Sequence, residues 1–165
     1  MNGNLMFSSK SNEWETPQVL FDKLNMEFRF TLDPAATIQN AKCNRFYTME
    51  DDGLMQDWQG ERVFCNPPYG RQLSAWIKKC YDESRKPGTT VVMLIPARTD
   101  IKAFHKYILG NAEIRFLKGR LKFINRLLPS YREDGDFKTS PAPFPSMVVV
   151  MKRHQEHQRS FLIGR

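Results

Sequence analysis

The most informative stretch of the sequence runs from Thr89 to Ile95, where nearly every side chain is apolar and several are β-branched. A strand of this composition is typical of the inside of a sheet that is covered on both faces. Pro96 follows directly, and proline cannot donate the hydrogen bond that a central strand needs in order to continue. The stretch therefore predicts a buried central strand that ends at Pro96.

Helical and extended patterns alternate around this strand. Apolar side chains at helical spacing predict a helix that opens at Thr16-Pro17 and reaches Phe28, and further helices over residues 73–84 and 101–109. Apolar and β-branched runs predict strands over residues 28–32, 62–65, 113–117 and 146–151, with a short one at 45–48. Such alternation favours an α/β fold with a mostly parallel sheet. No clear helix separates the last two strands, so we expect them to form an antiparallel pair at the C-terminal end.

The 165 residues fit a single domain, with a flexible tail over residues 1–12 and a polar, proline-rich stretch over residues 125–145. No apolar run is long enough to span a membrane, and the polar N-terminus does not resemble a signal peptide. We therefore expect a cytoplasmic protein. The three cysteines show no C-x-x-C spacing, so we expect reduced thiols and no metal site.

Charge is distributed unevenly along the chain. The first 70 residues carry 6 basic and 10 acidic side chains, whereas the remaining 95 carry 19 basic and 8 acidic ones. A basic half suggests a polyanionic partner, and phosphates are the usual one. A soluble protein that is merely basic would show the same balance, so charge alone favours a nucleic acid only modestly.

The motif Asn66-Pro67-Pro68-Tyr69 follows the strand predicted over residues 62–65. The motif offers groups that the methylation of an aromatic amine requires. Such an amine is a poor nucleophile because its lone pair is delocalised into the ring. Two acceptors that hold its N–H bonds would favour a tetrahedral nitrogen, whose lone pair is available for reaction. The side-chain oxygen of Asn66 and the carbonyl of Pro67 are suitable acceptors, and consecutive prolines stiffen the backbone between them. The ring of Tyr69 offers a flat face for a base. The simpler interpretation is a proline-rich turn that ends a strand.

Candidate site residues also fall where other predicted strands end. Asp33, Asn66 and Pro96 each stand at the carboxyl end of a predicted strand. In open α/β sheets the ligand site lies beyond the carboxyl ends of the strands. We therefore expect these three residues to converge on one edge of the sheet.

The motif matches that of S-adenosylmethionine-dependent amino-methyltransferases, and nearly the whole chain resembles the small, phage-type DNA N-6-adenine methyltransferases. The resemblance runs from about Ser11 to Met151. The matching segments are residues 14–17, 32–36, 50–54, 63–71, 93–100, 115–123 and 142–146. A long series of ordered matches is far more specific than a tetrapeptide.

The resemblance implies a compact Rossmann-like methyltransferase fold that uses S-adenosylmethionine to methylate the N6 amine of a flipped-out adenine in DNA. It implies a bacterial or phage-infected host cytosol as the location. It gives catalytic roles to Asn66, Pro67, Pro68 and Tyr69. It places the cofactor against Thr16, Pro17, Asp33, Pro34 and Ala35, and against Asp51 or Asp52. One departure is that residues 33–37 contain no glycine, although methyltransferases usually follow the first strand with a glycine-rich turn. Only 32 residues separate Asp33 from Asn66, so part of the usual sheet must be shortened or missing.

A base inside a duplex cannot reach such a pocket, so the enzyme is expected to flip it out. The residues expected to bind the DNA substrate are Arg98, Lys118, Arg120, Lys122 and Phe123, of which Phe123 would stack on the adenine opposite Tyr69. The simpler interpretations are a solvated strand edge for the basic cluster and a core position for Phe123. The stretch 125–145, with Arg126, Arg132 and Lys138, is the candidate DNA-reading loop.

Two alternatives stay open. The same motif serves methyltransferases that act on RNA bases or on protein glutamine, and the basic half disfavours only the protein substrate. The missing glycines also leave room for a non-catalytic nucleic-acid-binding module. The recognition sequence and the oligomeric state do not follow from the residues.

Overall fold

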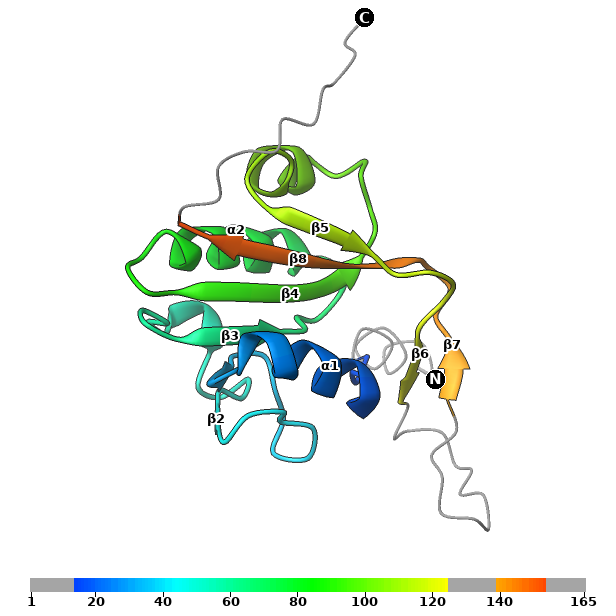
Figure 1. The fold of residues 1–165 in the computed structure, drawn as a ribbon, viewed down its shortest axis with the longest axis horizontal. Helices are drawn as coiled ribbons and strands as arrows, with labels where there is room; N and C mark the ends of the chain where they lie inside the picture. The colour runs from blue at the N-terminus through cyan, green and yellow to red at the C-terminus, as the bar shows by residue number, and fades with distance from the viewer. Residues whose placement is uncertain (1–13, 125–138, 154–165) are drawn as a thin grey trace, which may run out of the picture.

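The computed structural model describes residues 14–124 and 139–153, and its main feature is a six-stranded sheet (Figure 1). The strand order is β2-β1-β3-β4-β8-β5. The first four strands pair in parallel, and β8 runs antiparallel to both β4 and β5. The bounds are β2 (Arg45–Phe46), β1 (Leu32–Asp33), β3 (Arg62–Cys65), β4 (Thr90–Pro96), β8 (Ser146–Lys152) and β5 (Glu113–Phe116). This arrangement confirms the expected α/β class, with a mostly parallel sheet and an antiparallel pair, and it is compatible with a Rossmann-like fold.

The predicted central strand is β4, which lies between β3 and β8. It pairs with β3 from Arg62↔Thr90 to Cys65↔Met93. It pairs with β8 along its whole length, ending at Pro96↔Ser146. The side chains of residues 91–95 are almost completely buried because helices cover both faces of the sheet.

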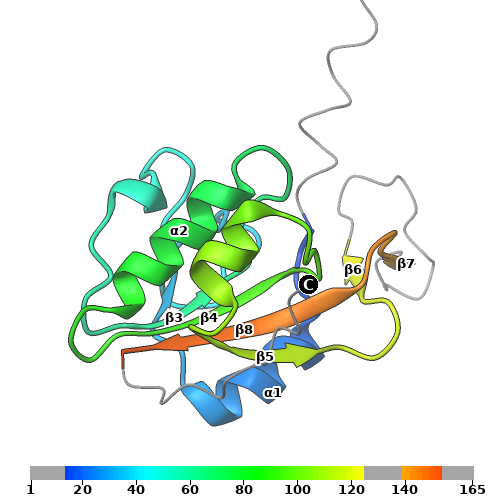
Figure 2. The same cartoon turned by 90° about the horizontal axis from the view of Figure 1, so that it is seen from above.

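Helices form the outer layers (Figure 2). Helix α1 (Gln18–Phe28) covers one face and buries Phe21, Leu24 and Phe28, which share one side of the helix. Helix α2 (Leu73–Ser84) and the π-helical turn η2 (Phe104–Ile108) cover the other face. The helix expected over residues 101–109 is present over residues 102–108, and most of it is this π-helical turn.

The strand expected over residues 28–32 was wrong in its bounds. Phe28 is the last residue of α1, and Arg29 ends the helix in the left-handed region with φ 53°. The chain reaches the sheet only at Leu32, so β1 has two residues. The ring of Phe28 is buried and that of Phe30 is partly buried in the layer between α1 and the sheet, where Phe30 packs on Phe21 and Phe64. Their apolar character therefore reflects core packing and no strand.

A small second sheet, which the sequence did not predict, lies beyond the main one. Strands β6 (Lys122–Ile124) and β7 (Thr139–Pro141) form it (Figure 1). Glu15 joins β6 through an antiparallel bridge to Ile124. The tail over residues 1–12 and residues 125–138 of the candidate DNA-reading loop, with Arg126, Arg132 and Lys138, lie outside the described residues. Within the described part of the chain, no helix is long and apolar enough to cross a membrane.

Candidate functional site

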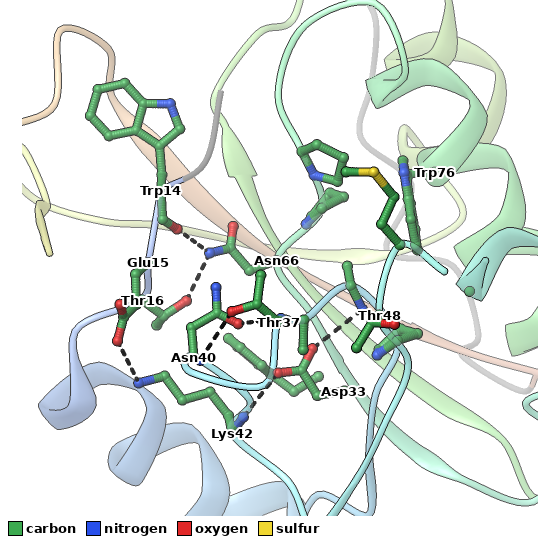
Figure 3. Close-up of a pocket in the computed structure, with 18 of the residues that line it drawn as sticks. Trp14, Glu15, Thr16, Asp33, Thr37, Asn40, Lys42, Thr48, Asn66 and Trp76 are labelled. Carbon is green, nitrogen blue, oxygen red and sulfur yellow. Dashed lines mark hydrogen bonds and ion pairs between the residues drawn. The ribbon is translucent and has the colours of Figure 1, made fainter. Parts of the chain in front are cut away.

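The carboxyl ends of β1 and β3 open onto a cavity of about 330 Å³ (Figure 3). Three segments far apart in the sequence surround it: the residues before α1, the loop after β1 and the motif after β3. Its lining includes Thr16, Asp33, Pro34, Ala35, Asp52, Asn66, Pro67 and Pro68, all of which were expected in the site. Pro17 and Asp51 were expected there too, but they do not line the cavity.

Asp33 lies at the floor of this cavity and is 4% exposed. Its carboxylate accepts hydrogen bonds from the backbone N–H of Lys42 at 3.0 Å and of Ala35 at 3.4 Å (Figure 3). Burial raises the pKa of Asp33 to about 6, and the two backbone hydrogen bonds oppose that rise only in part. Asp33 therefore braces the loop after β1 and also presents a titratable carboxyl group to the cavity.

The loop after β1 keeps its shape without glycine. The backbone N–H of Thr37 donates to the Asn40 side chain at 2.7 Å, and the N–H of Asn40 donates to the Thr37 hydroxyl at 3.2 Å (Figure 3). Reciprocal bonds of this kind between short polar side chains and the backbone stabilise tight turns. Side-chain hydrogen bonds therefore stabilise this loop, which contains no glycine.

The two neighbouring acids expected to contact the cofactor occupy different places. Asp51 is exposed and accepts hydrogen bonds from the backbone and hydroxyl of Thr48, which hold its pKa below the ordinary value. Asp52 lines the cavity and caps the short helix η1 (Gly53–Met55) by accepting from Leu54 N–H. Of the two, only Asp52 can face a molecule in the cavity.

Gly53 brings η1 against the loop after β1. A Cβ atom at this position would lie 2.0 Å from the carbonyl oxygen of Pro34, so only glycine fits there without movement of the backbone. The Gly53 carbonyl also accepts from the indole N–H of Trp58 at 3.1 Å. This close approach forms one wall of the cavity.

The cavity combines apolar walls with charges of both signs. Phe64, Met49, Leu54 and Trp76 supply apolar surface, and the buried indole N–H of Trp76 has no hydrogen-bond partner among the described residues. Asp33, Asp52 and Glu15 line it as acids. Lys42 lines it as a base, with its Nζ 3.0 Å from Gln18 and 3.9 Å from the Glu15 carboxylate. The sequence analysis did not identify Lys42 or Trp76 as residues of the site.

Both the nitrogen and the oxygen of the Asn66 amide group form hydrogen bonds. Its Nδ2 donates to the Trp14 carbonyl at 2.5 Å and to the Thr16 hydroxyl at 3.0 Å (Figure 3). Its Oδ1 accepts from the Tyr69 hydroxyl at 2.8 Å. The same hydroxyl lies 3.1 Å from the Leu94 carbonyl, so one proton faces two acceptors. Burial raises the pKa of Tyr69 above its ordinary value, and the phenol is neutral.

A second hollow lies next to Tyr69. Trp14 and Phe144 supply further aromatic walls, with ring centroids 5.3 Å apart and edge to face. Basic side chains at its rim are Arg71, Arg98 and Arg120. The structure thus brings Arg98 and Arg120 together with Tyr69, as the sequence suggested, and adds Trp14, Arg71 and Phe144.

The remaining residues expected to bind substrate lie elsewhere. Lys118 and Lys122 are exposed and line neither of the two hollows. Phe123 is 1% exposed and packs against Trp14 and Tyr69, with centroids at 5.4 and 6.3 Å. A ring that is buried in this way offers no free face for a base, so the structure places Phe123 in the core behind the hollow.

Residues 14–124 and 139–153 contain no cluster of three or more His, Cys, Asp or Glu side chains able to hold a metal ion. The motif that lines the two hollows offers the Asn66 amide, the Pro67 and Pro68 backbone and the Tyr69 hydroxyl. These groups can orient an amine and accept its N–H bonds.

Comparison with known proteins agrees with this chemistry. The family model described as DNA N-6-adenine-methyltransferase (Dam) matches residues 4–164. A protein named DNA N-6-adenine-methyltransferase from Haemophilus phage HP1 (strain HP1c1) is 32% identical over 147 residues, which cover 87% of this chain and 80% of that protein. Another of the same name, from Escherichia phage T1, is 30% identical over 110 residues, which cover 66% of this chain and 45% of that protein.

Proposed function

Since this chain belongs to the DNA N-6-adenine-methyltransferase (Dam) family, we propose that it methylates the exocyclic N6 amine of adenine in DNA, with S-adenosylmethionine as the donor. The observation that carries the proposal is the position of Asn66 and Tyr69. Asn66 lines a cavity of mixed charge, and Tyr69 lines an aromatic hollow with arginines at its rim. An enzyme that transfers a group from one substrate to another needs two adjacent sites, with the reacting groups of the two substrates between them.

The residues that line the cavity suit the donor. S-adenosylmethionine supplies an activated methyl group on a sulfonium, and it carries an amino-acid end and an adenine. Asp33 would hold the ammonium through a charge-assisted hydrogen bond, and Lys42 would favour the carboxylate. Trp76 and Leu54 would cover the adenine, and Asp52 would accept a hydrogen bond from its amine.

The hollow next to Tyr69 suits a nucleotide. A duplex base must leave the stack to enter it, and the guanidinium groups of Arg98 and Arg120 would hold the flanking phosphates. Oδ1 of Asn66 and the carbonyl of Pro67 would accept the two N–H bonds of the adenine amine. This would favour a tetrahedral nitrogen whose lone pair is available to the methyl group. The N–CH3 bond would form as the S–CH3 bond of the sulfonium breaks, the neutral thioether would leave, and the amine would lose a proton to water.

The test is methyl transfer from tritiated S-adenosylmethionine to DNA, RNA and protein substrates. Wild-type protein should transfer the tritiated methyl group to DNA. Asn66→Ala should lower the rate of this transfer by about 10²–10³-fold, as expected for the loss of one preorganised hydrogen-bonding group. Donor affinity should change little. Asn44→Ala is the matched control, because Asn44 is exposed and lines neither hollow. Label on RNA or protein alone would reject DNA as the substrate, and full activity of Asn66→Ala would reject the catalytic assignment.

A further inference from the structure

Three residues before α1, Trp14 to Thr16, form a strap across the end of β3. Both partners of the Asn66 amide nitrogen belong to this strap, although they lie 52 and 50 residues away in the sequence. Figure 3 shows the Asn66 nitrogen facing the strap and its oxygen turned away from it. The strap therefore bears directly on the orientation of the side chain that would meet the substrate.

The chemistry of the strap selects one orientation of the amide. A backbone carbonyl can only accept a hydrogen bond, so the Asn66 atom that faces the Trp14 carbonyl must be the nitrogen. The Thr16 hydroxyl accepts a second bond from the same nitrogen. Rotating the amide by half a turn would place two oxygens against each other, and it would turn the acceptor oxygen away from Tyr69.

The strap is itself held by groups other than Asn66. The Glu15 carbonyl accepts from Ile124 N–H at 3.1 Å, which ties the strap to β6. The Trp14 ring packs between Phe123 and Phe144, with centroids 5.4 and 5.3 Å away. The side chain of Thr16 is buried. Because these contacts exist independently of Asn66, the strap can impose an orientation on the amide.

We propose that Thr16 is a positioning residue for the methyl transfer, acting through the Asn66 amide. Together with the Trp14 carbonyl, its hydroxyl fixes the amide with Oδ1 directed toward the target amine. This inference rests on the function proposed above. It also gives Thr16 a role different from the cofactor contact that the sequence resemblance implies.

The first test compares Thr16→Val with Thr16→Ser. Valine has nearly the shape of threonine but no hydroxyl group, whereas serine keeps the hydroxyl. Thr16→Val should lower the single-turnover rate of methyl transfer at saturating donor by about threefold to tenfold, the range expected for one neutral hydrogen bond. The Kd for the donor and the KM for DNA should stay within about twofold of wild type. Thr16→Ser should recover most of the rate.

The second test is Asn66→Asp, which needs no change in the strap. The substitution keeps an acceptor oxygen for the substrate but sets a second oxygen against the Trp14 carbonyl, which cannot donate. The variant should lose about as much activity near neutral pH as Asn66→Ala. Protonation of the introduced carboxyl group supplies a donor, so its rate should rise as the pH falls from about 8 to about 5. The wild-type rate at saturating donor should not rise over this range.

The outcomes separate this inference from the proposed function. An active Asn66→Ala would overturn the function itself. If Asn66→Ala is inactive but Thr16→Val keeps its rate and binds the donor weakly, Thr16 is a cofactor ligand and the positioning role is refuted. Equal losses in Thr16→Val and Thr16→Ser would also refute it. If Thr16→Val does not fold, the pH profile of Asn66→Asp tests the positioning role instead. A methyl-transfer rate of Asn66→Asp near neutral pH that equals the wild-type rate would overturn the inference.

Discussion

Donor binding should strengthen as the pH rises through about 6, because the Asp33 carboxyl group must ionise in order to pair with the donor ammonium. Burial raises the pKa of this carboxyl from 3.8 to about 6 in the free protein. At pH 5 only about a tenth of the molecules would carry the charged form, whereas at pH 7.5 nearly all would. A ligand that requires the charged form should therefore bind about tenfold more weakly at pH 5 than at pH 7.5.

The same ionisation affects stability with the opposite sign. A carboxyl group whose pKa is raised in the folded state holds its proton more tightly there than in the unfolded chain. The free energy of unfolding of the free protein should therefore fall as the pH rises from about 4 to about 6, and the loss is complete above the folded pKa. Saturating donor should reverse that trend, because it stabilises the charged form.

Calorimetric titration of S-adenosylmethionine between about pH 5 and about pH 8 measures the binding effect. Asp33→Asn keeps the size of the side chain and an acceptor for the Lys42 N–H, but it cannot ionise. This variant should bind weakly with no pH step. 5′-Methylthioadenosine lacks the amino-acid end and serves as a control ligand, whose affinity should not change near pH 6. A step of the same size in Asp33→Asn, or with the control ligand, would refute the assignment of Asp33.

Two further predictions concern the walls of the site. Gly53→Ala should destabilise the fold by about 1–3 kcal/mol and weaken donor binding, because its Cβ would lie 2.0 Å from the Pro34 carbonyl; an unchanged melting temperature in thermal unfolding would contradict this. Replacing Arg98 and Arg120 together with alanine should lower the slope of log affinity for DNA against log salt by about one unit per lost phosphate contact, equally on all duplexes. Lys23→Ala, on the exposed side of α1, should leave the slope unchanged, and an unchanged slope in the double variant would place the phosphate contacts elsewhere.

The features of the fold that could be predicted are those encoded in short, continuous patterns. The apolar, β-branched run that became β4 is typical of a strand covered on both faces, and Pro96 sets its end. In helix α2, the spacing of Trp76, Ile77 and Cys80 in the sequence indicates which face is buried. Each of these signals depends on neighbours within a dozen residues, so the sequence alone carried them.

The end of α1 could not be predicted, for a physical reason. Phe28 and Phe30 form an apolar series that crosses the boundary between helix and loop, and the packing of both rings against the core gives no sign of where the helix stops. The stop is a left-handed Arg29, a conformation that glycine usually signals and arginine does not. The expected strand was therefore extended over residues that belong to the helix.

The roles of individual site residues depended on contacts that sequence distance conceals. Whether Asp51 or Asp52 faces the cavity depends on Thr48, whose hydroxyl and N–H hold Asp51 away from it. Phe123 is buried because β6 pairs with β7 and with Glu15, neither of which is close to it in the sequence. Motif matching identified the residue types, whereas long-range pairing decided which of them are exposed.

The strap connects the two hollows, and this has a consequence for how the site works. Trp14 lines both of them, while Glu15 and Thr16 line only the cavity at the carboxyl ends of β1 and β3. A molecule bound in that cavity would therefore contact Trp14 and Thr16, the two residues that hold the Asn66 amide, and Trp14 also lines the hollow next to Tyr69. Because the strap is also tied to β6, the Asn66 amide and the two-stranded β6–β7 sheet are linked by a continuous chain of hydrogen bonds and ring contacts. We expect substitutions in the strap to alter the rate of transfer more than the affinity for either substrate, since the strap orients the group between them.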